Sequence, residues 1–215
     1  MIKKYGETAS AAEIVSEVSK DEIFYFHSGG GVTLSGGEPC AQADFAAELL
    51  CELKKHGIHT SVETALCVPW ENMETLLPYL DCVLADLKHM NNEQHKRWTG
   101  ADNLSVLENI RRIDSSDFPV SLVIRVPLIP GINDDDENLK AAAMLARELT
   151  KKLQAIELLP YHRLGLNTYR MLGRPYQLDS VAVSKREHIE ERANFLRSCD
   201  PGVPVLAGNM QIADN

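Results

Sequence analysis

Residues 31–63 read GVTLSGGEPCAQADFAAELLCELKKHGIHTSVE. The stretch begins with a short β-rich run, passes through a glycine-rich turn, and continues as an expected helix whose apolar face carries Phe45, Leu49 and Leu53. Gly57 ends this helix, and residues 58–63 then alternate in polarity as a strand does. A strand, a helix and a second strand in this order predict a βα unit whose strands run in parallel.

The same alternation continues along the rest of the chain. Further strands are expected at residues 82–87, 120–128, 153–159 and 203–206, and helices at residues 69–77, 103–113, 133–150 and 184–197. An earlier helix at residues 11–18 is predicted by a capping box formed by Ser10 and Glu13. No low-complexity linker separates these elements, so we predict a single α/β domain over residues 1–215. Its parallel strands form either a partial barrel or an open sheet, because a complete eight-fold barrel takes about 250 residues.

Length and charge limit the classes of protein to which the chain can belong. Of its 215 residues, 22 are Lys or Arg and 31 are Asp or Glu, which gives a net charge of −9. This acidic balance argues against a nucleic-acid-binding protein, whose affinity depends on neutralising phosphates. No apolar run approaches the ~20 residues that cross a membrane, and the first residues lack the apolar segment of a secretory signal. We therefore expect a cytoplasmic protein that binds neither nucleic acid nor a membrane.

The five cysteines are Cys40, Cys51, Cys67, Cys82 and Cys199. An odd number of cysteines in a chain without a secretory signal indicates free thiols in a reducing compartment. Even the closest pair, Cys40 and Cys51, is too far apart for a CxxC motif. The sequence therefore lacks the cysteine spacing of a zinc or iron–sulfur site.

The turn SGGEP at residues 35–39 is the most distinctive motif. It is no P-loop, because Gly36 is followed by Gly37 and Glu38 instead of Lys and Ser or Thr. It is no dinucleotide fingerprint either, because Leu34 stands where a glycine is needed. Paired glycines let the backbone approach a ligand closely, and the Glu38 carboxylate can bind an ammonium group. The alternative is a glycine-rich turn with a solvated glutamate.

Polar side chains recur at the carboxyl ends of the predicted strands: Glu38, Glu63, Asp86, Lys88 and His162. In addition, Arg125 interrupts an otherwise apolar strand. Taken singly, each has a structural explanation, such as a helix cap, an ion-pair partner or a hydrogen-bonded loop histidine. Ligand sites of parallel α/β proteins form at this edge of the sheet, so together these residues predict a binding site.

The chain resembles the activating enzymes of glycyl radical enzymes, which are radical S-adenosylmethionine (SAM) proteins typified by pyruvate formate-lyase activating enzyme. The stretches that carry the resemblance are YFHSGGGVTLSGGEP at 25–39, GIHTSVET at 57–64, ADLKH at 85–89, WTG at 98–100, RVPLIPG at 125–131 and LPYH at 159–162. They recur in order over roughly residues 5–180. Any one of them is weak evidence, but their combination is highly specific.

The resemblance implies a partial (β/α) barrel of six units, with SAM bound across the carboxyl ends of the strands. It implies a [4Fe-4S] cluster, chelated by SAM, that delivers one electron into the sulfonium. The resulting 5′-deoxyadenosyl radical removes a hydrogen atom from a backbone glycine of a partner glycyl radical enzyme, such as pyruvate formate-lyase. A flavodoxin or ferredoxin is the expected electron donor. Which glycyl radical enzyme is activated stays open, because related activating enzymes share these motifs.

The resemblance also implies roles for individual residues. The residues expected to bind SAM are Gly36, Gly37 and Glu38 at its amino group, Asp86 and Lys88 beside its ribose and carboxylate, and His162 as a further contact. Arg125 lies on the segment of the family's fifth strand. A monovalent-cation site near SAM aligns with Glu63, Thr64 and Asp86, although some relatives carry Asp where this chain has Glu63.

One family feature is missing from this chain. The family holds its cluster with a CxxxCxxC motif after the first strand, and this sequence has no such motif. We therefore expect the carboxyl-terminal portion of a longer activating enzyme, lacking the first strand and the cluster loop. Such a chain alone should neither hold the cluster nor generate a radical. Its sheet should have an open edge through which copies of the chain pair with one another.

Two other functions remain open. An aldolase-like barrel would use Lys88 as a Schiff-base nucleophile with help from Asp86. A non-catalytic SAM-binding or docking module would have lost its cluster while keeping the rest of the site.

Overall fold

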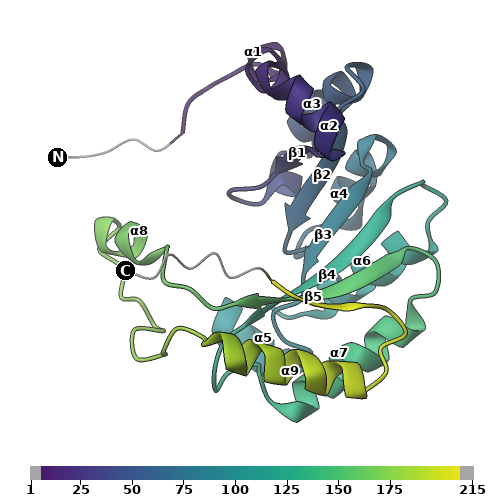
Figure 1. The fold of residues 1–215 in the computed structure, drawn as a ribbon. Helices are drawn as coiled ribbons and strands as arrows, with labels where there is room; N and C mark the ends of the chain where they lie inside the picture. The colour runs from purple at the N-terminus through teal and green to yellow at the C-terminus, as the bar shows by residue number, and fades with distance from the viewer. Residues whose placement is uncertain (1–5, 209–215) are drawn as a thin grey trace. The chain divides into compact units, whose positions relative to one another are not determined.

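The computed structural model describes residues 6–208, which form an α/β fold (Figure 1). The strands within that range are β1 (Gly31–Leu34), β2 (His59–Thr64), β3 (Cys82–Asp86), β4 (Ser121–Leu128), β5 (Leu153–Pro160) and β6 (Val205–Ala207). They form one sheet in the order β1-β2-β3-β4-β5-β6. The pairings β1–β2, β4–β5 and β5–β6 are parallel, and no pairing of β1 with β6 closes the sheet within the described residues. The predicted parallel α/β fold is confirmed, and the open sheet is that of a partial barrel.

Helices connect the strands. The α-helices of residues 6–208 are α1 (Ala11–Val18), α2 (Glu22–Ser28), α3 (Ala43–Lys55), α4 (Trp70–Leu76), α5 (Asn92–Thr99), α6 (Leu104–Ser115), α7 (Asp136–Glu148), α8 (Leu166–Met171) and α9 (Arg186–Ser198). The 3₁₀ turns are η1 (Ser19–Asp21), η2 (Pro39–Gln42) and η3 (Leu77–Tyr79). Among the described residues, no helix has both the length and the apolarity to cross a bilayer.

The chain divides into two compact units. The first contains residues up to Leu84 together with Asp117–Ser121, and the second contains Ala85–Ser116 together with the residues from Leu122 onward. The boundary falls inside β3, between Leu84 and Ala85. The expectation of a single domain over residues 1–215 stays a prediction.

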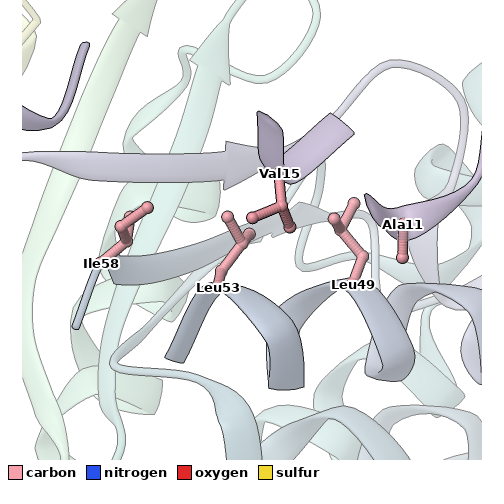
Figure 2. Close-up of a cluster of buried hydrophobic side chains, with 5 residues drawn as sticks. All are labelled: Ala11, Val15, Leu49, Leu53 and Ile58. Carbon is pink, nitrogen blue, oxygen red and sulfur yellow. The ribbon is translucent and has the colours of Figure 1, made fainter. Parts of the chain in front are cut away.

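An apolar cluster holds the first unit together. It contains Ala11 and Val15 of α1, Leu49 and Leu53 of α3, and Ile58 just before β2 (Figure 2). The predicted capping box begins α1, since the Ser10 hydroxyl accepts the Glu13 N–H and the Glu13 carboxylate accepts the Ser10 N–H. Val32 and Leu34 of β1 pack against the same cluster. The cluster therefore fixes β1, and with it the start of the glycine turn.

β1 approaches β2 unusually closely at Gly31. Gly31 pairs with His59, and a Cβ atom at position 31 would lie 1.9 Å from the His59 carbonyl oxygen. Only glycine fits there. Beyond β1, Gly36 has φ +111°, a backbone conformation that favours glycine, and this residue turns the chain towards η2.

In the second unit, β4 alternates strictly between buried and half-buried residues. Ile124 and Val126 are buried, whereas Arg125 and Pro127 between them are half-buried. Successive side chains of a strand point to opposite faces, so one face of β4 is packed and the other carries the less buried residues. That second face contains Arg125, one of the predicted site residues.

Buried asparagines connect the loops that follow β3 and β4. The Asn133 side-chain amide donates to the carbonyl oxygens of Lys88 and Pro127, at 2.8 Å each, and its oxygen accepts the Ile129 N–H. Asn138 of α7 donates to the Asn133 carbonyl in turn. These bonds fix the backbone of Lys88.

Candidate functional site

The Glu38 carboxylate is bound by three donors of the first unit. Its Oε1 accepts the Cys40 N–H at 3.2 Å and the Thr64 hydroxyl at 2.7 Å, and its Oε2 accepts the Ala65 N–H at 3.0 Å. Glu38 thereby caps η2 and joins the glycine turn to the end of β2. It is half-buried, whereas Gly36 and Gly37 are exposed. The alternative of a solvated glutamate is thus not what the structure shows, because three hydrogen bonds hold this carboxylate in place.

The two glycines of the turn leave space for a ligand. A Cβ atom at Gly36 or Gly37 would meet no atom within 4 Å, so packing is not the reason for glycine at Gly37. A bare backbone with open space beside it allows a ligand to approach the peptide groups closely. The predicted contacts of this turn with a SAM amino group fit this geometry.

Asp86 and Lys88 form an ion pair at the end of β3. The Lys88 Nζ lies 2.9 Å from the Asp86 Oδ2, and 16% of the Asp86 side chain is exposed. The other carboxylate oxygen, Oδ1, is buried and accepts no hydrogen bond from the described residues. Most buried polar atoms in native proteins have partners, so this oxygen is a candidate acceptor for a ligand hydroxyl, a cation or water.

The same ion pair bears on the aldolase alternative. A Schiff-base lysine must lose its proton before it attacks a carbonyl group. In this structure the Lys88 Nζ is instead engaged in the ion pair with the Asp86 carboxylate. Lys88 is therefore better suited to binding an anionic group, such as a carboxylate, than to nucleophilic attack.

Arg125 of β4 pairs with Glu157 of β5. The two residues are register partners in the parallel ladder, and Arg125 Nε lies 3.2 Å from Glu157 Oε2. The sequence indicated Arg125 as a candidate site residue but did not indicate Glu157, which lies in a mostly apolar strand. Glu157 could have been found because it is a single acidic residue within that strand.

His162 follows β5 and is exposed. Its Nδ1 accepts the Leu164 N–H at 3.4 Å, and no hydrogen bond joins it to Asp86 or Lys88 in the part of the chain that the structure describes. Its neighbour Tyr161 is buried and forms a 2.7 Å hydrogen bond with the hydroxyl of Tyr176. Burial, together with this bond, raises the pKa of Tyr176 to about 12.

The second unit contains a cavity of about 440 Å³. The residues that line it come from positions 88–89, 95–99, 127–133 and 169–178, and they include Lys88, Trp98, Tyr169 and Tyr176. The buried His95 donates from Nδ1 to the Ala101 carbonyl oxygen at 2.8 Å, because a carbonyl oxygen can only accept. Burial lowers the pKa of His89, so this residue is neutral at pH 7. The cavity thus combines the aromatic walls of Trp98, Tyr169 and Tyr176 with the imidazoles of His89 and His95 and the Lys88 side chain.

The five cysteines do not fit an iron–sulfur cluster. All five are free thiols within residues 6–208, and no three Cys, His, Asp or Glu side chains in that range lie close enough together to hold a metal ion. Iron–sulfur clusters need several thiolates at one place. The described residues therefore offer no cluster site. In the first unit the open glycine turn, and in the second unit the unpartnered Asp86 oxygen, can each receive a polar group of a ligand such as SAM.

Comparison with known proteins gives the family. The sequence pattern that defines the Radical SAM superfamily matches residues 3–143. The chain is 38% identical over 214 residues to the (2S)-3-sulfopropanediol dehydratase activating enzyme of Klebsiella oxytoca, covering 98% of this chain and 66% of that protein. It is 42% identical over 182 residues to the isethionate sulfite-lyase activating enzyme of Oleidesulfovibrio alaskensis, covering 85% and 58%. The chain thus spans about three fifths of the length of the curated relatives that it matches.

A solved structure agrees with these relatives. A domain of pyruvate-formate lyase-activating enzyme from Bacteroides vulgatus superposes with a TM-score of 0.68 at 30% identity, covering 84% of this chain and 99% of that one. A radical SAM methyltransferase from Sphaerobacter thermophilus, at 18% identity and a TM-score of 0.66, covers 93% of this chain and 57% of its own length, and it shows the fold alone. The chain therefore belongs to the radical SAM superfamily and, within it, to the activating enzymes of glycyl radical enzymes.

Proposed function

We propose that this chain supplies the SAM-binding part of a glycyl-radical-enzyme activating enzyme. The observation that carries the proposal is the buried Asp86 Oδ1, which lacks a hydrogen-bond partner among the described residues and stands beside the Lys88 ammonium. Asp86 would accept a ribose hydroxyl, and Lys88 would bind the SAM carboxylate. Gly36, Gly37 and Glu38 would bind the SAM amino group.

The remaining predicted residues take supporting roles in this proposal. His162, exposed and close to the end of β5, would contact SAM after its loop adjusts, and Arg125 would act through its pair with Glu157. Glu63, Thr64 and Asp86 would supply oxygen ligands for a monovalent cation. Oxygen donors suit such hard cations.

The radical step needs a [4Fe-4S] cluster, which would reduce the SAM sulfonium when bound. The cysteines of this chain do not fit that cluster, so the chain alone should bind SAM without cleaving it. We propose that SAM cleavage also requires a cluster-bearing segment and an electron donor such as a flavodoxin or ferredoxin. A reducing compartment such as the cytoplasm would suit this chemistry. A non-catalytic docking module would bind SAM in the same way but would never cleave it. Adding a CxxxCxxC segment under anaerobic, reducing conditions separates the two functions, because only an activating enzyme should then cleave SAM.

Calorimetric titration with SAM tests the proposal. The wild-type chain should bind SAM, and Asp86→Asn should weaken the binding at least about tenfold, because it removes a charge from a partly buried site. Asp117→Asn, which changes an exposed acid, is the matched control and should bind as the wild type does. No binding by the wild type, or equal binding by Asp86→Asn, would contradict the proposed site. Borohydride trapping of a carbonyl compound on Lys88 would support the aldolase alternative instead.

The partner should be a polypeptide that presents a glycine. We propose that side chains flanking this glycine enter the 440 Å³ cavity, whose walls include Trp98 and Tyr169. Trp98→Ala should then weaken the binding of a glycine-loop peptide of pyruvate formate-lyase or a related enzyme, while SAM binding stays unchanged. Trp70→Ala in the first unit is the control. Comparing peptides from several glycyl radical enzymes in the same titration would identify the preferred partner.

A further inference from the structure

The Thr64 hydroxyl lies at the centre of a small hydrogen-bond network in the first unit. Thr64 ends β2 and is 2% exposed. Its Oγ1 donates to the Glu38 Oε1 at 2.7 Å and accepts the Leu66 N–H at 3.0 Å. An ionised carboxylate can only accept, and an amide N–H can only donate, so both directions are fixed. The single hydroxyl proton of Thr64 is therefore committed to Glu38.

The backbone that this network holds is unusual. Leu66 is fully buried and has φ +53°, in the left-handed region that non-glycine residues rarely adopt. Such conformations persist where surrounding contacts hold them, and they gather at functional sites. Here the Leu66 N–H bonds the same hydroxyl that binds Glu38. The strained turn and the glycine turn thus share the Thr64 hydroxyl, in addition to the direct bond from the Ala65 N–H to Glu38.

The carboxylate of Glu38 still has capacity for a ligand. An ionised carboxylate offers about four acceptor positions, and this chain fills three of them through Cys40, Thr64 and Ala65. Oε1 receives two of those bonds and Oε2 receives one. The donors therefore fix the carboxylate while leaving an acceptor position on Oε2.

We infer that Thr64 is a positioning residue, which holds Glu38 in the orientation that binds the SAM amino group. This inference rests on the proposed function, and it assigns the Thr64 hydroxyl a task separate from cation binding. The carboxylate side chain of Glu38 has several rotatable bonds, and fixing it before the ligand arrives lowers the entropy cost of binding. Thr64 need not touch SAM for this effect.

The test compares variants that keep or remove the hydroxyl. Thr64→Ser keeps it and should bind SAM within about twofold of the wild type, whereas Thr64→Val is isosteric and should bind about tenfold more weakly. Thr60→Val is the matched control. Thr60 is also a fully buried threonine of β2, but its hydroxyl bonds the Tyr79 carbonyl at 2.6 Å and the Asp81 carboxylate, and not Glu38. The Thr60→Val variant should therefore have a lower free energy of unfolding than the wild type but the same affinity for SAM.

A double-mutant cycle with Glu38→Gln shows whether Thr64 acts through Glu38. Thr64→Val should cost little further SAM affinity in the Glu38→Gln background. An undiminished effect in that background would overturn the inference. So would equal SAM binding by Thr64→Val and the wild type, or an equal loss in Thr60→Val.

Amide hydrogen exchange gives a readout that needs no SAM. The N–H groups of Cys40 and Ala65 donate to Glu38, and their exchange should accelerate in Thr64→Val but not in Thr60→Val or Thr64→Ser. If the wild type fails to bind SAM, the proposed function fails, and this exchange experiment still decides whether Thr64 orders the Glu38 turn. Unchanged exchange in Thr64→Val would overturn the positioning role.

Discussion

Cys40 shows how its surroundings set the chemistry of a single residue. Its thiol is buried beside Glu38, and its Sγ lies 3.8 Å from Thr64 Oγ1 and from Met73 Sδ. Burial, and then the nearby negative charge of Glu38, raise the pKa of Cys40 to about 12. The thiolate is the reactive form of cysteine, so this thiol is inert at neutral pH. Its position beside Glu38 nevertheless makes it a sensitive reporter of the glycine turn.

Iodoacetamide labelling should therefore distinguish the cysteines. At pH 8 the exposed Cys67 should react readily, while Cys40 should stay unmodified in the native chain, because it is buried and its raised pKa keeps the thiol protonated. Peptide mass spectrometry of the labelled chain measures both. Labelling of both residues after unfolding in urea is the control. Rapid labelling of native Cys40 would contradict the buried environment.

Between elements, close backbone contacts and shared polar groups hold the sheet of the first unit in register. Gly31 sets the approach of β1 to β2, because its missing side chain makes room for the His59 carbonyl. Asp81, just before β3, accepts the Thr60 N–H at 2.9 Å and the Lys54 ammonium at 2.6 Å. Its backbone carbonyl accepts the Ser121 N–H. These contacts place the start of β2, the strand that ends at Thr64.

Gly31→Ala should destabilise the chain by about 2–3 kcal/mol, because the new methyl group overlaps a backbone oxygen and forces β1 to shift. Urea denaturation followed by circular dichroism measures the effect. Gly37→Ala is the comparison, since its methyl group meets open space at an ordinary φ, and its stability should stay close to that of the wild type. Equal stability of the two variants would mean that β1 does not approach β2 so closely.

Asp81 should make stability depend on pH. Burial alone would raise its pKa, but the bonds from Lys54 and Thr60 outweigh burial, and the pKa lies below its usual value of 3.8. A lowered carboxylate pKa stabilises the fold above the unfolded pKa, and the contribution is lost as the pH falls through the folded value. At pH 6 the free energy of unfolding should therefore be larger for the wild type than for Asp81→Asn. This difference between the two free energies should shrink below pH ~4. A difference that grows on acidification would contradict this.

For the molecule as a whole, the ends of the sheet are the surfaces most open to other chains. Within residues 6–208, β1 pairs with β2 alone and β6 with β5 alone. Next to β1 in sequence, α2 exposes large apolar side chains, and Phe26 is 85% exposed. An unpaired strand edge offers hydrogen-bonding groups to another chain, and exposed apolar groups add to the attraction.

Copies of this chain should therefore associate at high concentration. Sedimentation velocity should show a sedimentation coefficient that increases with concentration. Thr33→Lys places a charge on the exposed part of β1, and Phe26→Ser removes an exposed apolar ring; both should reduce the association while leaving the fold intact. Leu206→Lys on the opposite terminal strand shows whether β6 contributes. A monomer at all concentrations would contradict the expectation.

Most of the secondary structure follows from local sequence. The strands, the capping box at Ser10 and the helix that follows the glycine turn lie within a few residues of their predicted bounds. Three short helices, α2, α5 and α8, were missed. For α5 the signals were present, since Asn91 caps its start and Gly100 ends it in the left-handed conformation. Its sequence is mostly polar, so apolar periodicity could not reveal it.

The pattern of strands, turns and motifs was thus enough for the parallel α/β fold, the family and the choice of Glu38, Asp86 and Lys88 as candidates. These features depend on residues that are close together in the sequence, so they can be recognised in the sequence directly. The partners of those candidates could not be predicted from local sequence, because Thr64 and Glu38, like Glu157 and Arg125, lie some thirty residues apart. Strand register brings Glu157 to Arg125, and the pairing of β1 with β2 together with the glycine turn brings Glu38 to Thr64. The burial of one Asp86 oxygen likewise depends on the residues that pack around it in the folded chain. Such contacts between residues distant in sequence do not alter the local pattern of polar and apolar residues, so the sequence could not predict them.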